Sequence, residues 1–560
     1  MSPTPVFPPV PRSVVSFLVA AACLASASSA QVPDSDVRVL LKSGDLLSSG
    51  DTVHTLFTPS IAEGGRWAVK GSVNGDPQQS ALFINGELAI KRGDVAPGGG
   101  TLLSIGTVRV SRDGAVAVSY FVEDPLSPSN VLTRLQIDAT AVLEEGDTVD
   151  FPVLGVSGTL TEIFGFDYDA PMLSASVVVA QPGGPAVRLL FTARVTGDTL
   201  DVLSGIVEGD PVPGAGAGAI YTIPGSDIQT LDQAGACHAF RFADGGQLEH
   251  GVYGFGQAVA AHAQPGPAPN SQWNFDRPAA VRINASNQVL TSGQLTLSSG
   301  ADRGVVYLDG TPIAVEGGGL NGVLGGIVGE FHSAPIALGE DGTPFFSVPL
   351  TTPGTQLLMA GDEILLRTGA TGTQVAGTTL NSLFATVQGP SFDVTPDGRT
   401  IIQRSRLTTG ESAILLVERG VGDPVTCAAE PNSTGMTGRL DAAGSRFLFV
   451  NDLSIVASQL PQDSFGYLNV SDSSTFVAMP GGSSGNLCIG PTVGRFVGQV
   501  QSSGSAGEIT TTVDLLSIPQ PTGFVASDPG DTWYYQLWHR DASPAGATSN
   551  FTEALSVTVQ

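Results

Sequence analysis

The sequence predicts an all-β protein: a seven-bladed β-propeller followed by a small disulfide-bonded β-sandwich. Three observations lead to this prediction. The chain has 71 glycines and 38 prolines, yet 41% of its 560 residues are apolar, a combination typical of many short strands joined by turns. A glycine-rich turn motif recurs through residues 44–423, and the C-terminal residues lack it. The length exceeds that of one ordinary core, so at least two domains are expected.

Residues 1–30 have the pattern of a secretory signal peptide. Arg12 precedes an apolar run at residues 14–25, and small residues follow, so we expect cleavage after Ala30. The run is too short to span a bilayer, and no later stretch is long and apolar enough to do so. A lipoprotein acylated at Cys23 is the alternative; we favour ordinary cleavage because Ala20 stands where a leucine is usual. We therefore expect a secreted protein, extracellular or at the cell surface, without a membrane span.

A recurring unit fills residues 31–424. Its turns follow one another at intervals of about 49 to 63 residues, near the spacing of propeller repeats. Inside a unit, turns such as Asn85-Gly86 and Asp113-Gly114 separate runs of alternating apolar residues, which indicates hairpins. Two hairpins give four strands, the content of one propeller blade. The unit turns lie at Gly44-Asp45, Gly93-Asp94, Gly146-Asp147, Gly209-Asp210, Pro265-Gly266, Gly317-Gly318, Thr368-Gly369 and Gly422-Asp423.

The two ends of this region suggest ring closure. The seventh unit reaches Gly422-Asp423 without room for a fourth strand, whereas residues 37–41 form an unassigned strand directly before the first turn. We expect this first strand to complete the seventh blade, because pairing there removes an open sheet edge. An open solenoid is the alternative architecture.

Residues 425–560 are expected to form a separate β-sandwich. Short apolar runs continue at the spacing of sandwich strands, including residues 447–450, 466–470 and 532–539. Cys427 and Cys488 both lie here, and in an exported protein we expect them to form a disulfide. Closing a loop of about 60 residues is worth roughly 4 kcal/mol. The remaining Cys237 is interpreted as a small buried side chain in preference to a nucleophile.

Two stretches of sequence resemble known families. The turn at residues 93–100, Gly-Asp-Val-Ala-Pro-Gly-Gly-Gly, carries the first likeness, and residues 427–435, 485–488, 519–523 and 531–541 carry the second. Residues 37–423 resemble a family of exported repeat proteins of planctomycete-type bacteria. Residues 427–560 resemble a C-terminal β module shared by many secreted proteins of the same bacteria. The resemblance implies the fold and an extracellular location, and it implies no activity.

The formal net charge of −27 limits the partners. A field of this sign repels phosphate backbones and anionic lipids, so nucleic-acid binding is not expected, and cations or neutral polymers are favoured as ligands. Only three lysines are present, Lys42, Lys70 and Lys91. We attach no functional weight to that bias.

Four aspartates occupy equivalent positions in the unit turns: Asp45, Asp94, Asp147 and Asp210. Blade symmetry could bring their carboxylates to one rim as an oxygen-rich Ca²⁺ site. We favour the alternative that each aspartate hydrogen-bonds to the backbone of its own turn. No other cofactor is expected.

Trp533 and Trp538 belong to one predicted strand and point to opposite faces of its sheet. One is expected in the core. The other could stack against sugar rings, although packing beneath a loop is the interpretation we favour.

No sequence motif establishes a catalytic activity. Residues 481–485 fit the G-x-S-x-G pattern and residues 317–322 fit G-x-G-x-x-G, but neither has the strand–turn–helix context that the chemistry requires. We therefore expect a non-enzymatic, monomeric binding or scaffold protein whose partner is an extracellular polysaccharide or protein, with the C-terminal module serving sorting or attachment. The alternative is a propeller-type polysaccharide hydrolase or lyase, with Asp167 and Asp169 as the first candidate acids.

Overall fold

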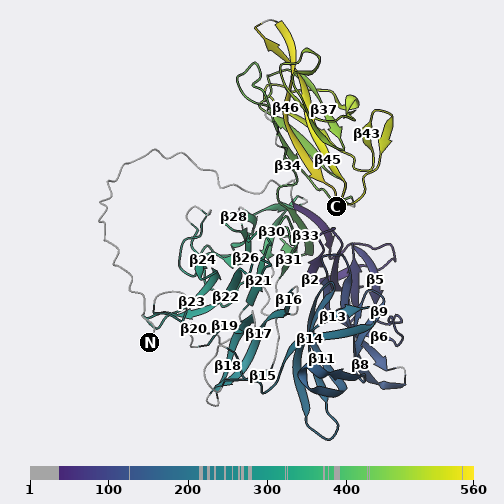
Figure 1. The fold of residues 1–560 in the computed structure, drawn as a ribbon, viewed down its shortest axis with the longest axis vertical. Helices are drawn as coiled ribbons and strands as arrows, with labels where there is room; N and C mark the ends of the chain where they lie inside the picture. Colours follow the sequence, from purple (N-terminus) through teal and green to yellow (C-terminus); the bar gives the residue numbers. More distant parts are fainter. Residues whose placement is uncertain are drawn as a thin grey trace, which may run out of the picture.

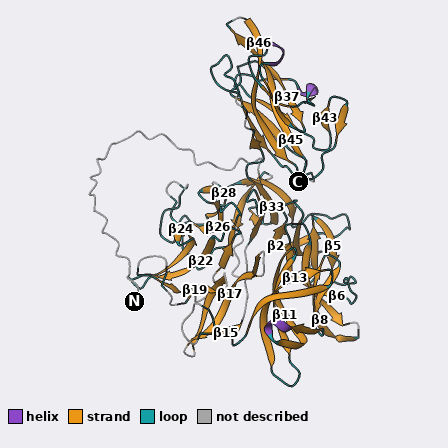
Figure 2. Ribbon diagram, in the orientation of Figure 1, coloured by secondary structure: helices purple, strands orange, loops and turns teal. Residues whose placement is uncertain are grey.

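A computed structural model describes residues 37–560 apart from 125, 214–218, 224–227, 232–234, 245–246, 255–256, 263–264, 267–269, 275–279, 322, 324–325, 370–371, 376, 384–390, 426, 428, 449 and 545. The predicted signal peptide, with Cys23, lies outside the described residues. The described part of the chain is all-β, as predicted (Figures 1 and 2). Its only helical segments are the single-turn 3-10 helices η2 (Pro152–Leu154), η3 (Pro480–Gly482) and η4 (Val497–Gln499). No helix in these described ranges has the length and apolar character of a membrane span.

Seven antiparallel sheets follow one another along residues 37–418. The first contains β2 (Val53–Ile61), β3 (Trp67–Val73), β4 (Ser80–Ile84) and β5 (Glu87–Lys91). The second contains β6 (Leu102–Val110), β7 (Val116–Asp124), β8 (Ser127–Ile137) and β9 (Thr140–Glu144). The third contains β10 (Thr148–Phe151), β11 (Val156–Asp169), β12 (Met172–Ala180), β13 (Ala186–Thr196) and β14 (Thr199–Val207).

The next three sheets repeat this order. The fourth contains β15 (Ile220–Ile223), β16 (Ile228–Leu231), β17 (Gly235–Asp244), β18 (Gln247–Gly254) and β19 (Gln257–Ala261). The fifth contains β20 (Gln272–Asn274), β21 (Ala280–Ile283), β22 (Val289–Thr296), β23 (Asp302–Leu308) and β24 (Thr311–Val315). The sixth contains β25 (Ile336–Leu338), β26 (Pro344–Pro349), β27 (Gln356–Ala360) and β28 (Glu363–Arg367).

The seventh sheet is completed by the first strand of the described chain. Its own strands are β29 (Gln374–Val375), β30 (Thr378–Leu383), β31 (Phe392–Val394), β32 (Thr400–Leu407) and β33 (Ser412–Glu418). Strand β1 (Val37–Lys42) pairs antiparallel with β33, from Val37 opposite Val417 to Lys42 opposite Ala413. The predicted pairing of residues 37–41 with the last unit is therefore confirmed. It occupies the edge of β33 that would otherwise be open.

A hydrophobic core joins each sheet to the next in chain order. For example, Leu82 of the first sheet packs with Val118 of the second, and Phe345 of the sixth packs with Phe392 of the seventh. The same kind of core joins the seventh sheet to the first, where Ile402 packs with Trp67. Each sheet is thus apolar on both faces, which explains the long buried runs in its central strands.

In several of these sheets the strand before the central pair, which we call the leading strand, is irregular or divided in two. Strands β2, β6 and β11 each carry register shifts against their partners, whereas β15 and β16 both pair with β17, and β30 and β31 both pair with β32. A bulge bends its strand and redirects the inserted side chain. These irregularities place side chains such as Phe57 outside the buried ladder, where Phe57 is 44% exposed.

The C-terminal unit, residues 423–560, encloses a core between two sheets. The larger sheet contains β34 (Asp423–Pro424), β46 (Gly546–Thr558), β45 (Thr532–Ser543), β37 (Phe465–Ser471), β40 (Gly494–Arg495) and β41 (Gln501–Ser502). The smaller contains β35 (Arg439–Ala443), β36 (Ser454–Ser458) and β42 (Ile509–Thr512). The short hairpins are β38 (Ser474–Val477) with β39 (Leu487–Ile489), and β43 (Ile518–Gln520) with β44 (Gly523–Val525). Because β34 pairs with β46, residues 423–424 join this unit rather than the seventh sheet.

Phe447, Leu448 and Val450 belong to an expected strand but lie outside any strand. Phe447 instead makes a wedge between the two parts of the chain. Phe447 is fully buried in the core shared by the first and seventh sheets. Its ring lies so close to Gly65 that a Cβ there would be 2.2 Å from it, so the glycine is required. Figure 1 shows the C-terminal unit, in green to yellow, at the end of β33. An apolar run specifies burial, but its contacts decide whether it forms a strand.

Candidate functional site

The Gly-Asp turns share one local geometry. In each, the glycine has a positive φ, between 92° and 99°, a conformation that few other residues adopt. The aspartate Oδ2 then accepts a hydrogen bond from the backbone N–H three residues earlier. These bonds join Lys42 to Asp45 (2.8 Å), Lys91 to Asp94 (2.9 Å), Glu144 to Asp147 (2.8 Å) and Val207 to Asp210 (2.9 Å).

This geometry corresponds to the interpretation in which each aspartate stabilises its own turn. Within the part of the chain that the structure describes, no group of three His, Cys, Asp or Glu side chains is placed to hold a metal ion. The same local hydrogen bond occurs once in each of the four turns, and it engages the carboxylates of Asp45, Asp94, Asp147 and Asp210.

The candidate acids Asp167 and Asp169 are both held in ion pairs. They lie at the end of β11 and face β6 of the second sheet. Arg109 Nε donates to Asp167 Oδ1 at 3.0 Å, and Arg112 Nε donates to Asp169 Oδ2 at 2.7 Å. Both carboxylates therefore serve as acceptors between two sheets.

Asp393 and Glu418 are carboxyl groups with raised pKa values, and each contacts a neighbouring part of the fold. Burial raises the pKa of Asp393, whose Oδ2 accepts bonds from Ser60 Oγ at 2.8 Å and the Ile61 N–H at 3.0 Å. Burial raises the pKa of Glu418 to about 7, where β33 meets the C-terminal unit. One carboxyl links the seventh sheet to the first, and the other links it to the C-terminal unit.

The two tryptophans of β45 point to opposite faces, as predicted. Trp533 is buried in the core of the C-terminal unit, and its Nε1 donates to Ser527 Oγ at 2.7 Å. Trp538 is half-buried on the other face, with its ring 5.1 Å from that of Tyr467 on the neighbouring strand β37. The Trp538 ring therefore already packs against a protein side chain, Tyr467.

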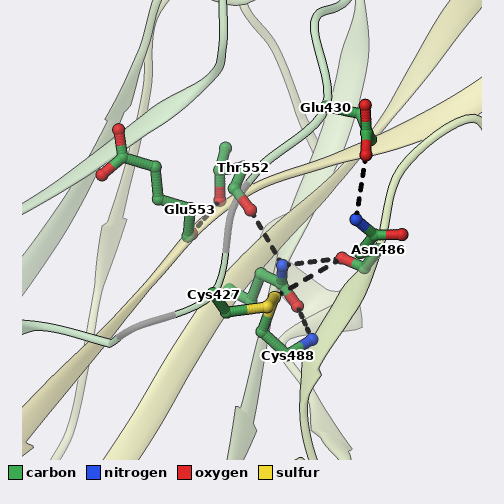
Figure 3. The surroundings of a disulfide bond; sticks show 7 residues. Cys427, Glu430, Asn486, Cys488, Thr552 and Glu553 are labelled. Carbon is green, nitrogen blue, oxygen red and sulfur yellow. Dashed lines mark hydrogen bonds between the residues drawn. A yellow bond between two sulfur atoms is a disulfide. The ribbon is translucent and has the colours of Figure 1, made fainter. Parts of the chain in front are cut away.

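The predicted disulfide between Cys427 and Cys488 is confirmed, with its Cα atoms 6.0 Å apart. Figure 3 shows the surroundings of the disulfide, with Asn486 and Thr552 labelled. The side-chain amide of Gln536 is buried there and contacts Cys488. That amide accepts a hydrogen bond from the Cys488 N–H at 2.8 Å and donates to the carbonyl oxygens of Asn486 and Thr552. Cys237 is fully buried in β17 with its Sγ 3.6 Å from the Val281 carbonyl oxygen, which matches its interpretation as a small core residue.

A group that the sequence analysis did not predict lies where the first and seventh sheets meet. Phe57 sits in the bulge of β2, and two cations approach its ring: Lys70 Nζ at 5.4 Å and Arg404 Cζ at 5.5 Å from the centroid. We call these three residues the Phe57 site. Burial lowers the pKa of both cations. The available signal was a lysine in the middle of the apolar strand β3, because buried lysines are rare.

A similar pairing occurs in the third sheet. Phe164, 51% exposed, lies beside a register shift of β11, and Arg188 Cζ is 5.3 Å from its ring centroid. Cations over aromatic faces are attracted by the negative potential of the ring. Both bulges thus present an aromatic ring and a positive charge together.

Comparison with known proteins identifies no family. No protein-family model matches the sequence, and no curated protein matches it. The fold is similar to solved structures at very low identity. The subtype N11 neuraminidase-like protein of A/flat-faced bat/Peru (H18N11) is 9% identical, with 71% of this chain and 92% of that chain covered and a TM-score of 0.27.

Two further solved structures are similar at equally low sequence identity. Extracellular domains 1-2 of Drosophila semaphorin 1a are 8% identical, with 66% and 74% of the two chains covered and a TM-score of 0.23. Xylan β-1,4-xylosidase from Bacillus halodurans is 9% identical, with 90% and 91% covered and a TM-score of 0.20.

Proposed function

We propose that this chain is a secreted, non-enzymatic binding or scaffold protein. Its seven sheets are the blades of a β-propeller, which presents loops to an extracellular polymer or protein. The C-terminal unit is a β-sandwich that serves sorting or attachment, and the protein acts as a monomer.

The contacts between sheets support the propeller. Each sheet shares a core with its neighbours in chain order, and the seventh also shares one with the first. Strand β1 supplies the last strand of the seventh sheet, and an open solenoid would leave its first and last sheets apart. Radial repetition of this kind leaves only short, protected edges.

One observation carries the choice of binding over catalysis: the two carboxylates that the sequence offered as candidate acids are engaged as structural acceptors. Asp167 and Asp169 are each paired with an arginine of the neighbouring sheet. Each carboxylate would have to leave its arginine before it could exchange a proton with a substrate.

The test is a ligand screen on the mature protein. Neutral and acidic polysaccharides and Ca²⁺ are added, the melting temperature is followed, and released sugars are analysed. We expect a rise in melting temperature without product, since a ligand at 100 times its Kd stabilises the folded state by about 2.7 kcal/mol. Release of oligosaccharide that is abolished by Asp167→Asn or Asp169→Asn would instead establish the hydrolase or lyase alternative.

A further inference from the structure

The Phe57 site is formed by an insertion in a leading strand. In β2, Leu56 lies opposite Gly71 and Pro59 lies opposite Val69, so Phe57 and Thr58 together face the single residue Lys70. The bulge turns the Phe57 ring out of the ladder, and 44% of the residue remains exposed. An exposed phenyl ring on a leading strand is a surface that a ligand can reach.

Lys70 differs from the other two lysines in its lack of an ion pair with any described carboxylate. Lys42 Nζ lies 3.0 Å from Glu411 and Lys91 Nζ lies 2.8 Å from Asp51, whereas within the described residues Lys70 forms no ion pair. It is half-buried, and burial alone lowers its pKa. In a chain with 52 acidic and 25 basic residues, acidic partners are plentiful, so this arrangement is unusual. Burying a charge costs free energy unless something compensates for it.

Arg404 brings a second positive charge to the same ring from the seventh sheet. Its strand neighbour Gln403 lies opposite Phe392, and Ser405 lies opposite Leu383, so Arg404 faces the break between β30 and β31. Lys70 faces the bulge of β2 in the same way. The two cations occupy corresponding positions in adjacent sheets, and the contact between the seventh and first sheets brings them to 5.4 Å and 5.5 Å from the centroid of the Phe57 ring.

Two like charges near one ring repel each other, and an anion between them would replace repulsion with attraction. The ring itself offers a flat apolar face of the kind that C–H groups pack against. The net charge of −27 opposes densely charged polyanions, because long-range repulsion acts on every charge of the polymer. A ligand with one carboxylate on a compact, largely neutral body fits both conditions.

We propose that the Phe57 site binds the carboxylate of an acidic sugar, a uronic-acid residue within an otherwise weakly charged extracellular polysaccharide. This inference rests on the proposed binding function and names its ligand class. It departs from the expectation, drawn from net charge, that cations or neutral polymers would be preferred. The carboxylate lies between Lys70 Nζ and the Arg404 guanidinium, and the sugar ring lies against Phe57.

The experiment measures binding of sodium glucuronate to the mature protein by calorimetry, with glucose and sodium sulfate as comparison ligands. We expect glucuronate to bind and glucose not to bind. Lys70→Met should weaken glucuronate binding at least tenfold, while Lys70→Arg, which keeps the charge, should retain most of it. Lys42→Met is the matched control, because it removes a lysine that is paired with Glu411, and it should leave the affinity unchanged.

Several outcomes would overturn the proposal. Glucuronate binding that is absent, or unchanged in Lys70→Met, means that the site holds no carboxylate. Equal binding of sulfate means that it accepts any small anion, and preferential binding of an acidic peptide would assign it to a protein partner. If a neutral polysaccharide binds wild type and Lys70→Met equally, the proposed binding function stands and this inference alone fails. A thermal melt of each variant confirms folding. Lys70→Met should not lower the melting temperature, since it removes a half-buried charge that forms no ion pair with a described residue.

Discussion

Glu418 is an acid buried at the joint between β33 and the C-terminal unit. Only 5% of the residue is exposed, and the backbone N–H of Arg446 lies 3.4 Å from its Oε1. Burial raises its pKa to about 7, because desolvation of the carboxylate outweighs the nearby Arg446 cation. Arg446 instead forms its ion pair with Asp397, at 3.0 Å. The joint is therefore best satisfied when Glu418 is protonated.

This protonation makes stability depend on pH. Between its ordinary pKa of 4.5 and the folded value of about 7, the folded protein holds a proton that the unfolded chain has lost. The stabilisation is complete below pH 4.5 and is lost as pH rises through 7, a change of about 3 kcal/mol. We predict that Glu418→Gln removes this dependence, as measured by urea unfolding at pH 5 and pH 8. A variant with the same pH dependence as wild type would contradict the assignment.

The aspartates of the four Gly-Asp turns all play the same structural role. Each closes its turn by accepting from the backbone N–H three residues earlier. We predict that Asp94→Ala lowers the free energy of unfolding by about 1 kcal/mol, because that N–H loses its acceptor. Asp94→Asn keeps an acceptor oxygen and should cost less, as compared by urea unfolding. Equal losses in the two variants would show that the negative charge, and not the hydrogen bond, is what matters.

At the scale of elements, β1 joins the start of the described chain to its seventh sheet. Leu41 is 4% exposed and packs in the core between the first and seventh sheets, while the adjacent Leu40 is half-buried. Leu40 is the inserted residue of a bulge between Val39 and Leu41, and its side chain packs at the margin of the same core.

We predict that Leu41→Ala destabilises the protein by about 3 kcal/mol, the usual cost of a cavity in a packed core. Leu40→Ala is the matched control and should cost about 1 kcal/mol, since less apolar area is lost. Chemical unfolding of both variants makes the comparison. Equal effects would mean that β1 is held by its backbone pairing and that its buried side chain contributes little.

In the C-terminal unit, the disulfide joins two segments that are distant in sequence, as β1 does in the seventh sheet. It closes a loop across 61 positions and sits over the buried amide of Gln536. We predict that replacing both cysteines by serine lowers the stability of this unit by about 4 kcal/mol. The fluorescence of Trp533, in the core of the same unit, provides the measurement. A melting temperature unchanged by the double replacement would contradict this role.

At the scale of the whole molecule, the two parts of the chain are coupled through the wedge at Phe447. Its ring packs against Gly65 in the core between the first and seventh sheets, and Arg38 of β1 pairs with Asp452. The joint therefore combines a buried aromatic ring with charged contacts, a combination that favours a fixed orientation.

We predict that Phe447→Ala lowers the stability of the coupled protein by about 4 kcal/mol and separates its thermal unfolding into two transitions. Scanning calorimetry should show one transition in wild type and two in the variant. Leu448→Ala is the control, because Leu448 packs only against the core of the C-terminal unit. Two separate transitions already present in wild type would show that the parts unfold independently.

Local sequence signals predicted a large part of the fold. Alternating apolar residues around turns such as Asp113-Gly114 predicted hairpins that the strand pairings confirm. The short strand at residues 37–41 and the cysteine pair were also placed correctly. The hairpins depend on a few neighbouring residues. The first strand and the cysteine pair each have one evident partner elsewhere in the chain. The apolar run at residues 447–450 was misassigned, because its described residues lie outside any strand and Phe447 is inserted in the core between the first and seventh sheets.

The sequence by itself determined the all-β class, the turn chemistry of Asp94 and its counterparts, and the disulfide, because each follows from short-range spacing or from elimination. Only the tertiary structure decided that Asp167 is paired with Arg109, that Phe447 inserts beside Gly65, and that Lys70 and Arg404 meet at Phe57. Lys70 and Arg404 are more than 300 positions apart in the chain. Both reach the Phe57 ring because the seventh sheet packs against the first. Local sequence periodicity cannot predict which sheets pack together.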